Sequence, residues 1–470
     1  MINYKDLGLK IGLEVHQQIE AGGKLFCRCH CVIKDTEPDF IIKRHLRVSA
    51  SELGEVDQAA LYELKKGLYA VYQGYNDVNC LVELDEEPCN EINKEALDIA
   101  LQVSLLLKAK PVGVVQFMRK IVIDYSNVSG FQRTALIATN GKIETSQGTV
   151  RIPVICLEEE SAKKVEDTGT YKIYNISRLG IPLIEISTSP DIKTPDHAKE
   201  TAEKIGMVLR SVKGVKRGLG TIRQDINLSL KEHPRVELKG FQDLRSIPKV
   251  VEHEISRQLE LIRQNKELKS EVRKVEDDFT TTFLRPMPGA DRMYVETDVP
   301  LIYLTKELLK KIKLPELIAE KVENLEEKYN LQPELAREVI KNNIDLEKYM
   351  NEYKNLDANL IARTIIELPK EIKARFELDI SKLKEQHFRE VLGLVNAKKL
   401  QKAFILDALV ELMRNNIIRL ERFATLTDNE IEEIIKKLVE KNKGASFNAL
   451  MGEAMNKLKG KADPKKIVET

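Results

Sequence analysis

The sequence predicts an α+β protein, in which a large and mostly antiparallel β-sheet is followed by an α-helical region. The main observation is a change of character near residue 300. Before it, short runs alternate apolar with polar side chains and are separated by Gly and Pro. Beyond Thr305 the chain is rich in Glu, Lys and Leu with helical periodicity. The second observation is the length of 470 residues, which indicates about two to four domains.

Five β-type runs predict the main strands of the sheet. Several of them place apolar residues at every second position, which is the period of a strand with one buried face. The runs are LKIGLEVHQQI, KIVIDY, VRIPVICLEEE, GIPLIEIST and TIRQDINLSL, at residues 9–19, 120–125, 150–160, 180–188 and 221–230.

Helices are predicted in both parts of the chain. In the first part they cover residues 93–108, residues 195–212 with Thr194 as N-cap and Pro195 at the first helical position, and residues 248–268. Later, Pro315 and Pro333 indicate helix starts, short helices continue to about residue 400, and a last helical segment reaches Thr470. Thr427 begins a capping signal within this segment.

Composition excludes several classes of protein. The 75 Lys and Arg residues balance 74 Asp and Glu residues, which rules out a uniformly basic nucleic-acid coat and an acidic disordered tail. No apolar run approaches the roughly 18 residues that span a bilayer. No signal peptide is recognisable, and six cysteines are too few for a disulfide scaffold. We therefore expect a cytoplasmic protein that does not enter a membrane.

Carboxylates in the strand-like runs are candidate metal ligands. Glu14 and His16 lie two residues apart, so on a strand their side chains leave the same face. They could share a divalent cation, or form a solvated pair at the sheet rim. The run Glu158 to Glu160 ends another strand, where a cation or water would relieve the repulsion. Glu185 lies in an apolar run and needs either water or a cationic partner.

Basic residues in the same region are candidates for binding a polyanion. Arg178, Arg223 and Lys239 lie on or beside strands, close to Asp225 and Asn227. Such a set suits a triphosphate held with Mg²⁺, although structural salt bridges have the same composition. No GxxxxGK[ST] motif occurs and no GxGxxG follows a strand, so a nucleotide would be held by side chains and metal.

Two further clusters have both a functional and an ordinary interpretation. Cys27, Cys29 and Cys31 are dense enough for zinc, with Cys80, Cys89 or a histidine as fourth ligand, but a reducing compartment also tolerates free thiols. Near the C-terminus, lysines could attract a phosphate backbone or simply form a solvated helix face. These lysines are Lys457, Lys459, Lys461, Lys465 and Lys466.

Seven segments between about residues 10 and 300 carry a family resemblance: IGLEVHQQI, MRKIVIDYSNVSGFQRTALIAT, ICLEEESAK, SRLGIPLIEISTSPDI, GTIRQDINLS, VELKGF and FLRPMPGADRMYVETDVP. In this order they resemble the GatE subunit of the archaeal glutamyl-tRNA(Gln) amidotransferases, which is related to the bacterial and organellar GatB subunit. A weaker resemblance covers the helical remainder through GASFNALMGEAMNKLKGKADPKKI.

The resemblance implies a two-step reaction on Glu-tRNA(Gln). ATP phosphorylates the glutamyl side-chain carboxylate, and ammonia then displaces phosphate to give Gln-tRNA(Gln). An asparaginase-like partner, the GatD subunit, supplies the ammonia through a tunnel within a heterodimer or heterotetramer. The family architecture implies a cradle domain with the kinase and transamidase site at residues 1–300, a helical domain at 301–404 and a YqeY-like tail at 405–470, the last two gripping the tRNA.

The same resemblance assigns roles to individual residues. It implies Mg²⁺ on Glu14, His16, Glu158 and Glu159, with Glu185 nearby, and phosphates facing Arg178, Arg223 and Lys239, supported by Asp225 and Asn227. Lys120 and Gln132 resemble pocket or tunnel residues. The chain also departs from the family. Tyr125 replaces a usual Gly, Val295 replaces a usual Pro, the second Cys pair of zinc-binding relatives is displaced, and an inserted domain expected before Phe283 is missing.

Overall fold

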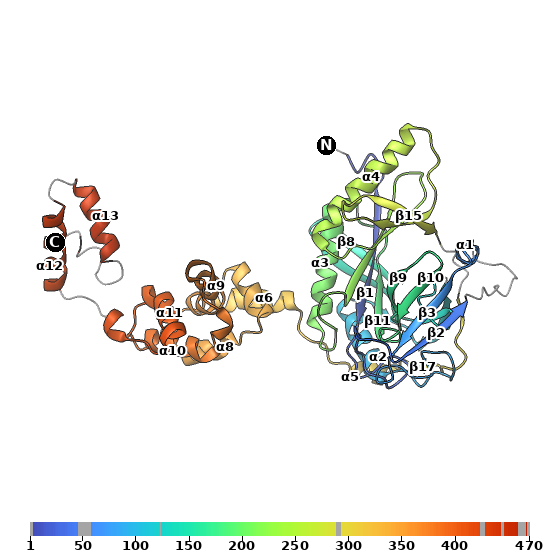
Figure 1. The fold of residues 1–470 in the computed structure, drawn as a ribbon, viewed down its shortest axis with the longest axis horizontal. Coiled ribbons are helices and arrows are strands. Elements are labelled where there is room, and N and C mark those ends of the chain that lie inside the picture. Colours follow the sequence, from blue (N-terminus) through green and yellow to red (C-terminus); the bar gives the residue numbers. More distant parts are fainter. Residues whose placement is uncertain are drawn as a thin grey trace. The chain divides into compact units, whose positions relative to one another are not determined.

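The computed structural model describes residues 3–45, 58–122, 124–287, 293–423, 428–442 and 446–458, and residue 467. The chain divides into two compact units, Met1–Ile318 and Ala319–Thr470 (Figure 1). The first unit contains the β-sheets and the second is helical, as the α+β prediction requires. The unit boundary lies beyond the one expected at residue 300, because a short strand pair and a helix after that point still belong to the first unit.

One large sheet forms the frame of the first unit. Its path is β15-β14-β13-β12-β1-β11-β8-β7-β6-β16, and β4 pairs with β7. Every pair is antiparallel except β13 with β14. The strands are β1 Lys10–Gln18, β4 Lys110–Pro111, β6 Phe117–Ile121, β7 Phe131–Thr145, β8 Gly148–Glu159, β11 Pro182–Ser187, β12 Ile222–Ser229, β13 Val236–Lys239, β14 Glu271–Val275, β15 Thr281–Pro286 and β16 Met293–Val295.

Alternation along these strands separates an apolar face from a polar one. On β1 the side chains of Ile11, Leu13 and Val15 are buried in the main core, so Glu14 and His16 point to the opposite face. Three helices supply the other half of that core, namely α2 Lys94–Leu106, α3 Pro195–Ser211 and α4 Ile247–Arg263. Figure 1 shows α3 and α4 side by side along the sheet. The polar face is therefore the one that these helices leave uncovered.

The ends of the first two helices agree with the expected capping signals. Asn93 accepts a hydrogen bond from the backbone N–H of Ala96, and Thr194 accepts one from His197. Each cap satisfies one of the backbone donors that a helix start leaves without a partner. The third helix begins one residue earlier than expected, with Pro248 inside its first turn.

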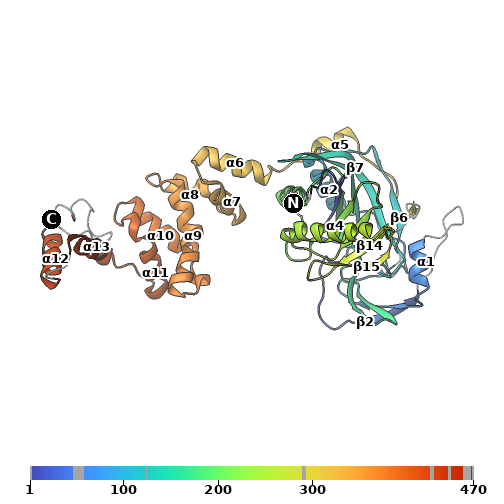
Figure 2. The same ribbon diagram turned by 90° about the horizontal axis from the view of Figure 1, so that it is seen from above.

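The first unit also contains a second, four-stranded sheet, whose edge strand β2 is labelled in Figure 2. Its order is β2-β3-β10-β9, with β2 Phe40–His45, β3 Tyr69–Gly74, β9 Lys163–Asp167 and β10 Tyr171–Asn175. Tyr72 and Tyr174 donate hydrogen bonds to the backbone oxygens of Tyr125 and Asp124. Tyr125 has a φ of 69°, a left-handed conformation that favours glycine. This conformation agrees with the glycine that the resemblance implies at this position.

The remaining elements of the first unit are short. They are the helices α1 Gln58–Leu64 and α5 Lys306–Lys311, the 3₁₀-helix η1 Leu244–Ser246, and the paired strands β5 Val114–Val115 and β17 Ile302–Tyr303. Between β14 and β15 the chain makes a tight turn, in which the Glu276 N–H donates to Thr280 and the Phe279 N–H donates to Glu276. Within this fully described stretch, no domain is inserted between the two strands.

The second unit consists of helices in its described residues. They are α6 Ile318–Tyr329, α7 Pro333–Lys341, α8 Leu346–Glu352, α9 Ala358–Phe376, α10 Glu385–Asn396, α11 Ile405–Asn415, α12 Asp428–Lys441 and α13 Phe447–Lys457, with the 3₁₀-helices η2 Ile380–Lys382, η3 Lys402–Phe404 and η4 Leu420–Phe423. Pro333 begins α7 as expected, whereas α6 begins three residues after Pro315. Thr427 lies outside the described residues. In the part of the chain described, we find no helix with the length and apolar character needed to cross a bilayer.

Candidate active site

The polar face of the large sheet collects most of the residues predicted to act in chemistry. Seven neighbouring strands, from β13 to β6, contribute one or more polar side chains each. Their alternation and registers place these side chains on the same face. They are Glu14, His16, Lys120, Gln132, Glu158, Glu185, Arg223, Asp225, Asn227 and Lys239.

The centre of this face could hold a divalent cation. Glu14, His16 and Glu185 each offer a ligand atom, and these atoms lie within 4.8 Å of one another. Burial, together with the nearby Arg223 guanidinium, lowers the pKa of His16 to about 4, so its ring is neutral at pH 7. The Nδ1 atom of His16 is buried and has no hydrogen-bond partner among the described residues. An imidazole with a free nitrogen beside two carboxylates fits a divalent metal ion.

The carboxyl groups of Glu14 and Glu185 have pKa values shifted in opposite directions. Burial, and next the Glu185 carboxylate, raise the pKa of Glu14 well above its usual range. Glu185 contacts His16 at 3.8 Å and Lys120 at 3.4 Å. Although burial acts against ionisation, Lys120 and His16 hold the pKa of Glu185 far below its usual range. The pKa values of these two adjacent carboxyl groups therefore shift in opposite directions, and a bound cation would favour the ionised form of both.

Lys120, Gln132 and Glu158 form a contact group beside this centre. Lys120 Nζ lies 2.8 Å from the Glu158 carboxylate, and Gln132 donates to the same group at 3.0 Å. Burial raises the pKa of Glu158 to about 7, against the opposing effect of Lys120. The two residues that resemble pocket or tunnel residues therefore both contact one carboxyl group that can exchange a proton near neutral pH.

Glu159 does not join the other predicted metal ligands. It lies on the opposite face of β8, because successive side chains of a strand alternate. There the backbone N–H of Arg133 donates to its carboxylate at 3.1 Å, and the Arg133 guanidinium lies at 3.4 Å. Arg133 in turn contacts the fully buried Glu296 at 2.7 Å. The expectation that Glu158 and Glu159 share one metal is thus corrected.

Glu160 returns to the polar face and holds two arginines. Arg223 donates to both of its carboxylate oxygens, at 2.6 and 2.8 Å, and Arg178 lies 4.0 Å away. Arg178 is fixed by hydrogen bonds to the backbone oxygens of Ser161 and Ala162, both at 2.7 Å. Burial alone would raise the pKa of Glu160, but Arg223 and Arg178 lower it to about 2.

Lys239 lies in a different, acidic environment. Its Nζ contacts Asp225 and Glu237, each at 2.6 Å. Glu237 was not among the residues predicted from sequence, although it lies two positions before Lys239 in the VELKGF segment and hence on the same face. Its carboxylate, that of Asp225 and that of Glu14 lie within 4.8 Å of one another.

The cysteines form a separate cluster away from this face. Cys27, Cys29, Cys80 and Glu83 place their ligand atoms within 4.8 Å of one another. Hydrogen bonds from Cys27 and Cys80 favour the thiolate form of Cys29 and lower its pKa to about 4. Cys31 is not part of this cluster, and its backbone oxygen accepts a hydrogen bond from Lys216. Three thiols and a carboxylate suit a tetrahedral zinc site.

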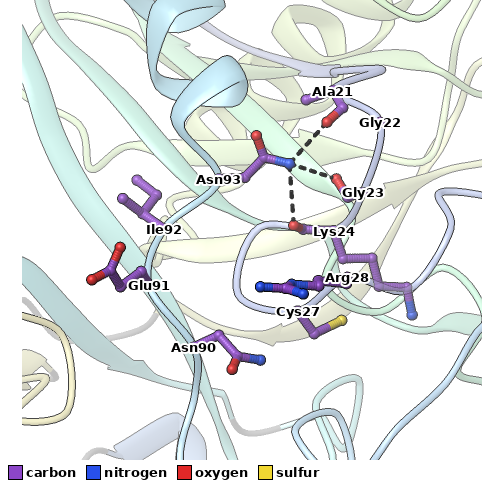
Figure 3. Close-up of a pocket in the computed structure, with 10 residues that line it drawn as sticks. All are labelled: Ala21, Gly22, Gly23, Lys24, Cys27, Arg28, Asn90, Glu91, Ile92 and Asn93. Atoms are coloured by element: carbon purple, nitrogen blue, oxygen red, sulfur yellow. Dashed lines mark hydrogen bonds between the residues drawn. The ribbon is translucent and has the colours of Figure 1, made fainter.

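A cavity of about 630 Å³ opens beside this cluster (Figure 3). Asn93 closes one side of it by donating to the backbone oxygens of Ala21 and Gly23, at 2.9 and 3.1 Å. In Figure 3 the Cys27 sulfur and the Lys24 amino group extend away from Asn93. The buried Lys24 reaches Glu83 at 3.1 Å and so balances the acidic ligand.

The predicted tRNA-contacting lysines fall only partly within the structure. Lys457 is the last residue of α13 and its side chain is exposed. Lys459, Lys461, Lys465 and Lys466 lie outside the described residues.

Comparison with known proteins identifies the family. Residues 9–310 match the GatB/GatE catalytic domain, and residues 344–470 match the GatB domain. A glutamyl-tRNA(Gln) amidotransferase GatE subunit from Methanocaldococcus jannaschii is 38% identical, with 99% of this chain and 98% of the relative covered. The corresponding subunits from Methanococcus maripaludis and Methanosarcina barkeri are both 35% identical, with 100% and 98% of this chain and 98% and 97% of the relatives covered.

The lengths of these alignments bear on the missing inserted domain. The first extends over 618 positions, 148 more than the 470 residues of this chain, so at least that many positions have no counterpart here. Since both chains are covered almost completely, the missing positions are internal, as expected for a chain without the insertion. With a catalytic-domain match over more than half of its length, the chain belongs to the GatE family of archaeal glutamyl-tRNA(Gln) amidotransferase subunits.

Proposed function

We propose that this chain catalyses the ATP-dependent amidation of Glu-tRNA(Gln) to Gln-tRNA(Gln). The observation that carries the proposal is the polar face of the large sheet, where His16 and Glu185 lie beside the Glu158–Lys120 pair and the Arg223–Glu160 pair. This combination of a cation site, a titratable carboxyl group and guanidinium groups suits phosphoryl transfer to a carboxylate. The names of its relatives supply the substrate.

The reaction needs activation because a carboxylate is a poor acyl donor. An oxygen of the glutamyl carboxylate attacks the γ-phosphorus of ATP, the bond to the bridging oxygen breaks, and ADP leaves. Ammonia then attacks the acyl carbon, phosphate leaves, and the nitrogen loses a proton. Mg²⁺ held by Glu14, His16 and Glu185 would neutralise phosphate charge during the first step.

The protein's own groups have complementary roles in these steps. Arg223 and Arg178 present guanidinium N–H groups to phosphate oxygens. Lys120 holds the carboxyl groups of Glu158 and Glu185 on the polar face. Glu158 has a pKa near 7, which suits the transfer of the proton that ammonia loses on forming the amide. Burial of these groups strengthens each electrostatic contact relative to water.

The partners follow from the family. We propose that an asparaginase-like partner protein supplies ammonia, as the family resemblance implies. We also propose that the helical unit and its tail bind the tRNA, with Lys457 among the contacts. Removal of residues 405–470 should then raise the KM for tRNA and flatten its salt dependence. An unchanged KM would remove the tail from the tRNA interface.

The decisive experiment mixes purified chain, Glu-tRNA(Gln), ATP, Mg²⁺ and ammonium, followed by identification of the aminoacyl group. Free ammonium bypasses the partner, so Gln-tRNA(Gln) should form. Absence of product would favour a non-catalytic tRNA-binding scaffold. ATP turnover with other carboxylates, but not with Glu-tRNA(Gln), would favour a ligase of different specificity.

A matched pair of histidine variants links the activity to the proposed metal position. His16→Ala should lower amidation by at least about 100-fold while tRNA binding survives. His253→Ala, which changes an exposed residue of α4, should leave amidation unchanged. Equal activity of the two variants would refute the assignment of His16.

We also propose that Cys27, Cys29, Cys80 and Glu83 hold a structural Zn²⁺. The arrangement of three thiols and one carboxylate within 4.8 Å supports this. Metal analysis of the purified chain should find about one zinc per chain, lost in Cys80→Ser and kept in Cys31→Ser. Retention of zinc by Cys80→Ser would contradict the ligand set.

A further inference from the structure

Four cationic side chains, Lys120, Arg178, Arg223 and Lys239, belong to the site, and they differ in how many carboxylates each one contacts. Lys239 contacts two carboxylates, Asp225 and Glu237, each at 2.6 Å. Lys120 likewise contacts Glu158 and Glu185, at 2.8 and 3.4 Å. Counted by direct contacts, Lys239 belongs to a group with a net negative charge, which repels a phosphate.

The arginine end of the site has the opposite balance. Arg223 and Arg178 share the single carboxylate of Glu160, so this group keeps a net positive charge. The carboxylate is fully buried, whereas the Arg223 and Arg178 side chains are 31% and 24% exposed. The two guanidinium groups are therefore held from behind by a buried anion and can be reached by a ligand from the front.

The N–H donors of Arg178 and Arg223 also favour a phosphate site at these two arginines. Each guanidinium has five N–H groups, and the described contacts of Arg223 and of Arg178 use two each. The remaining donors suit the several oxygens of a phosphate, which planar guanidinium groups bind in a bidentate manner. Burial disfavours the charge of Lys239, but Asp225 and Glu237 hold its pKa above the usual range, as expected of a lysine committed to carboxylates.

We infer that Arg178 and Arg223, positioned by Glu160, form the subsite for the transferred phosphate, and that Lys239 holds Asp225 and Glu237 in place without contacting phosphate. This inference rests on the proposed function and narrows it, because three basic residues were candidates for the same role. Glu160 is in this view a positioning residue, since it acts through the arginines.

Direct binding of the ATP analogue AMP-PNP, measured by calorimetry at saturating Mg²⁺, tests the assignment. Arg178→Gln and Arg223→Gln should each weaken binding by at least about 10-fold, the usual loss for a charged hydrogen bond. Lys239→Gln should change it by less than about 3-fold. Arg151→Gln is the matched control, because Arg151 also grips a carboxylate in a bidentate manner, that of Asp191, but has no place in the site.

Binding of Mn²⁺ alone supplies a second readout. Lys239→Gln should bind Mn²⁺ more tightly than the native chain, because it removes a positive charge next to Glu14, Asp225 and Glu237. The arginine variants should not weaken it. If Arg223→Gln fails to fold, Arg223→Lys keeps the charge but not the planar fork and should still weaken AMP-PNP binding.

The separate effects of a Glu160 substitution on KM and on kcat distinguish a positioning role from a structural one. Glu160→Asp shortens the anchor by one methylene, so it should raise the KM for ATP more than it lowers kcat. Loss of AMP-PNP binding in Lys239→Gln equal to that in the arginine variants, or arginine variants that bind like the native chain, would overturn the inference. A native chain that binds no AMP-PNP and forms no Gln-tRNA(Gln) would instead refute the proposed function.

Discussion

At the scale of single residues, three consecutive glutamates have three different environments. Glu158 contacts Lys120 and Gln132 on the polar face, Glu160 holds Arg223 on the same face, and Glu159 lies behind the sheet against Arg133. Only the alternation of the strand separates them, since all three are buried carboxyl groups. Adjacent glutamates thus offer an internal comparison between a site role and a structural one.

That comparison gives a direct test. Glu158→Gln should lower amidation by at least about 100-fold, because it removes the proton acceptor beside Lys120. Glu159→Gln should keep kcat within about 3-fold but destabilise the fold by about 3 kcal/mol, because it leaves the buried Arg133 less well paired. Amidation assays and urea unfolding measure the two effects. A large loss of kcat in Glu159→Gln would place that residue in the chemistry.

Glu160 also determines part of the acid stability. Its pKa in the folded chain is about 2, below the usual value of about 4.3 in an unfolded chain. The ionised form therefore stabilises the fold by about 3 kcal/mol above about pH 4.3, and this contribution is lost as the pH falls toward about 2. Glu160→Gln should be less stable at neutral pH, and its stability should fall less across that acid range.

Urea unfolding at several pH values measures how the stability of the native chain and of Glu160→Gln changes with pH. Glu203→Gln, which changes an exposed residue of α3, should follow the native curve. If the Glu160→Gln and native curves run parallel through the acid range, Glu160 does not carry the ion pair in solution.

Several residues of the site could be predicted from sequence and others could not. The spacing of two between Glu14 and His16 was sufficient, because strand period alone decides their common face. Glu185 was recognisable as a carboxylate in an apolar run. Glu237 has the same spacing of two from Lys239, but no sequence pattern indicates its contact with Lys239 and its closeness to Asp225 on the next strand.

At the scale of elements, the N-cap of α2 connects the helix to the loop that carries Cys27 and Cys29. Asn93 caps the helix through Ala96 and also donates to the backbone oxygens of Ala21, Gly23 and Lys24. Those three residues lead directly into Cys27. One side chain therefore fixes both a helix start and the path of the cysteine loop.

Asn93→Ala should cost about 2–4 kcal/mol, because it removes the cap and the loop contacts together. Thr305→Ala removes only the cap of α5 and should cost about 1 kcal/mol. Thermal unfolding compares the two. Asn93→Ala should also release zinc more readily to a chelator, and an unchanged rate of release would show that the loop holds its shape without Asn93.

The elements themselves were mostly predictable, and the cysteine cluster was predicted in part, since Cys27, Cys29 and Cys80 were candidates but Glu83 was not. Apolar alternation predicted β1, β8, β11 and β12 to within about two residues at each end. The run at 120–125 failed in part, because β6 ends at Ile121 and the chain then turns through the left-handed Tyr125. Cys80 and Glu83 lie more than 50 residues from Cys27, and only the folded loops bring them together.

At the scale of the whole molecule, two units carry separate cores. The core of the large sheet and the smaller core around Tyr72 and Tyr174 both belong to the first unit. The second unit contains a further core between α12 and α13, built on Ile431, Leu438 and Leu458. The change of composition near residue 300 indicated this division. However, β17 pairs with β5 and α5 packs on the main core, so both belong to the first unit, and no local sequence pattern predicts this.

Calorimetry should therefore resolve at least two unfolding transitions. The larger enthalpy belongs to the first unit, because enthalpy scales with the number of residues folded. AMP-PNP with Mg²⁺ at about 100 times its dissociation constant should stabilise that unit alone by about 2.7 kcal/mol. A single transition that shifts as a whole would show that the units unfold together.

The tight turn between β14 and β15 is a position where a whole domain can be gained or lost. Strand ends at a hairpin lie about 5 Å apart, so a folded module with neighbouring termini can enter or leave there without disturbing the ladder. Asp277 and Asp278 form the exposed tip of this turn, and the alignment with the Methanocaldococcus jannaschii relative contains at least 148 positions without a counterpart in this chain. The hairpin tip is thus a suitable insertion site, where a fluorescent protein could be inserted while the catalytic face keeps its geometry.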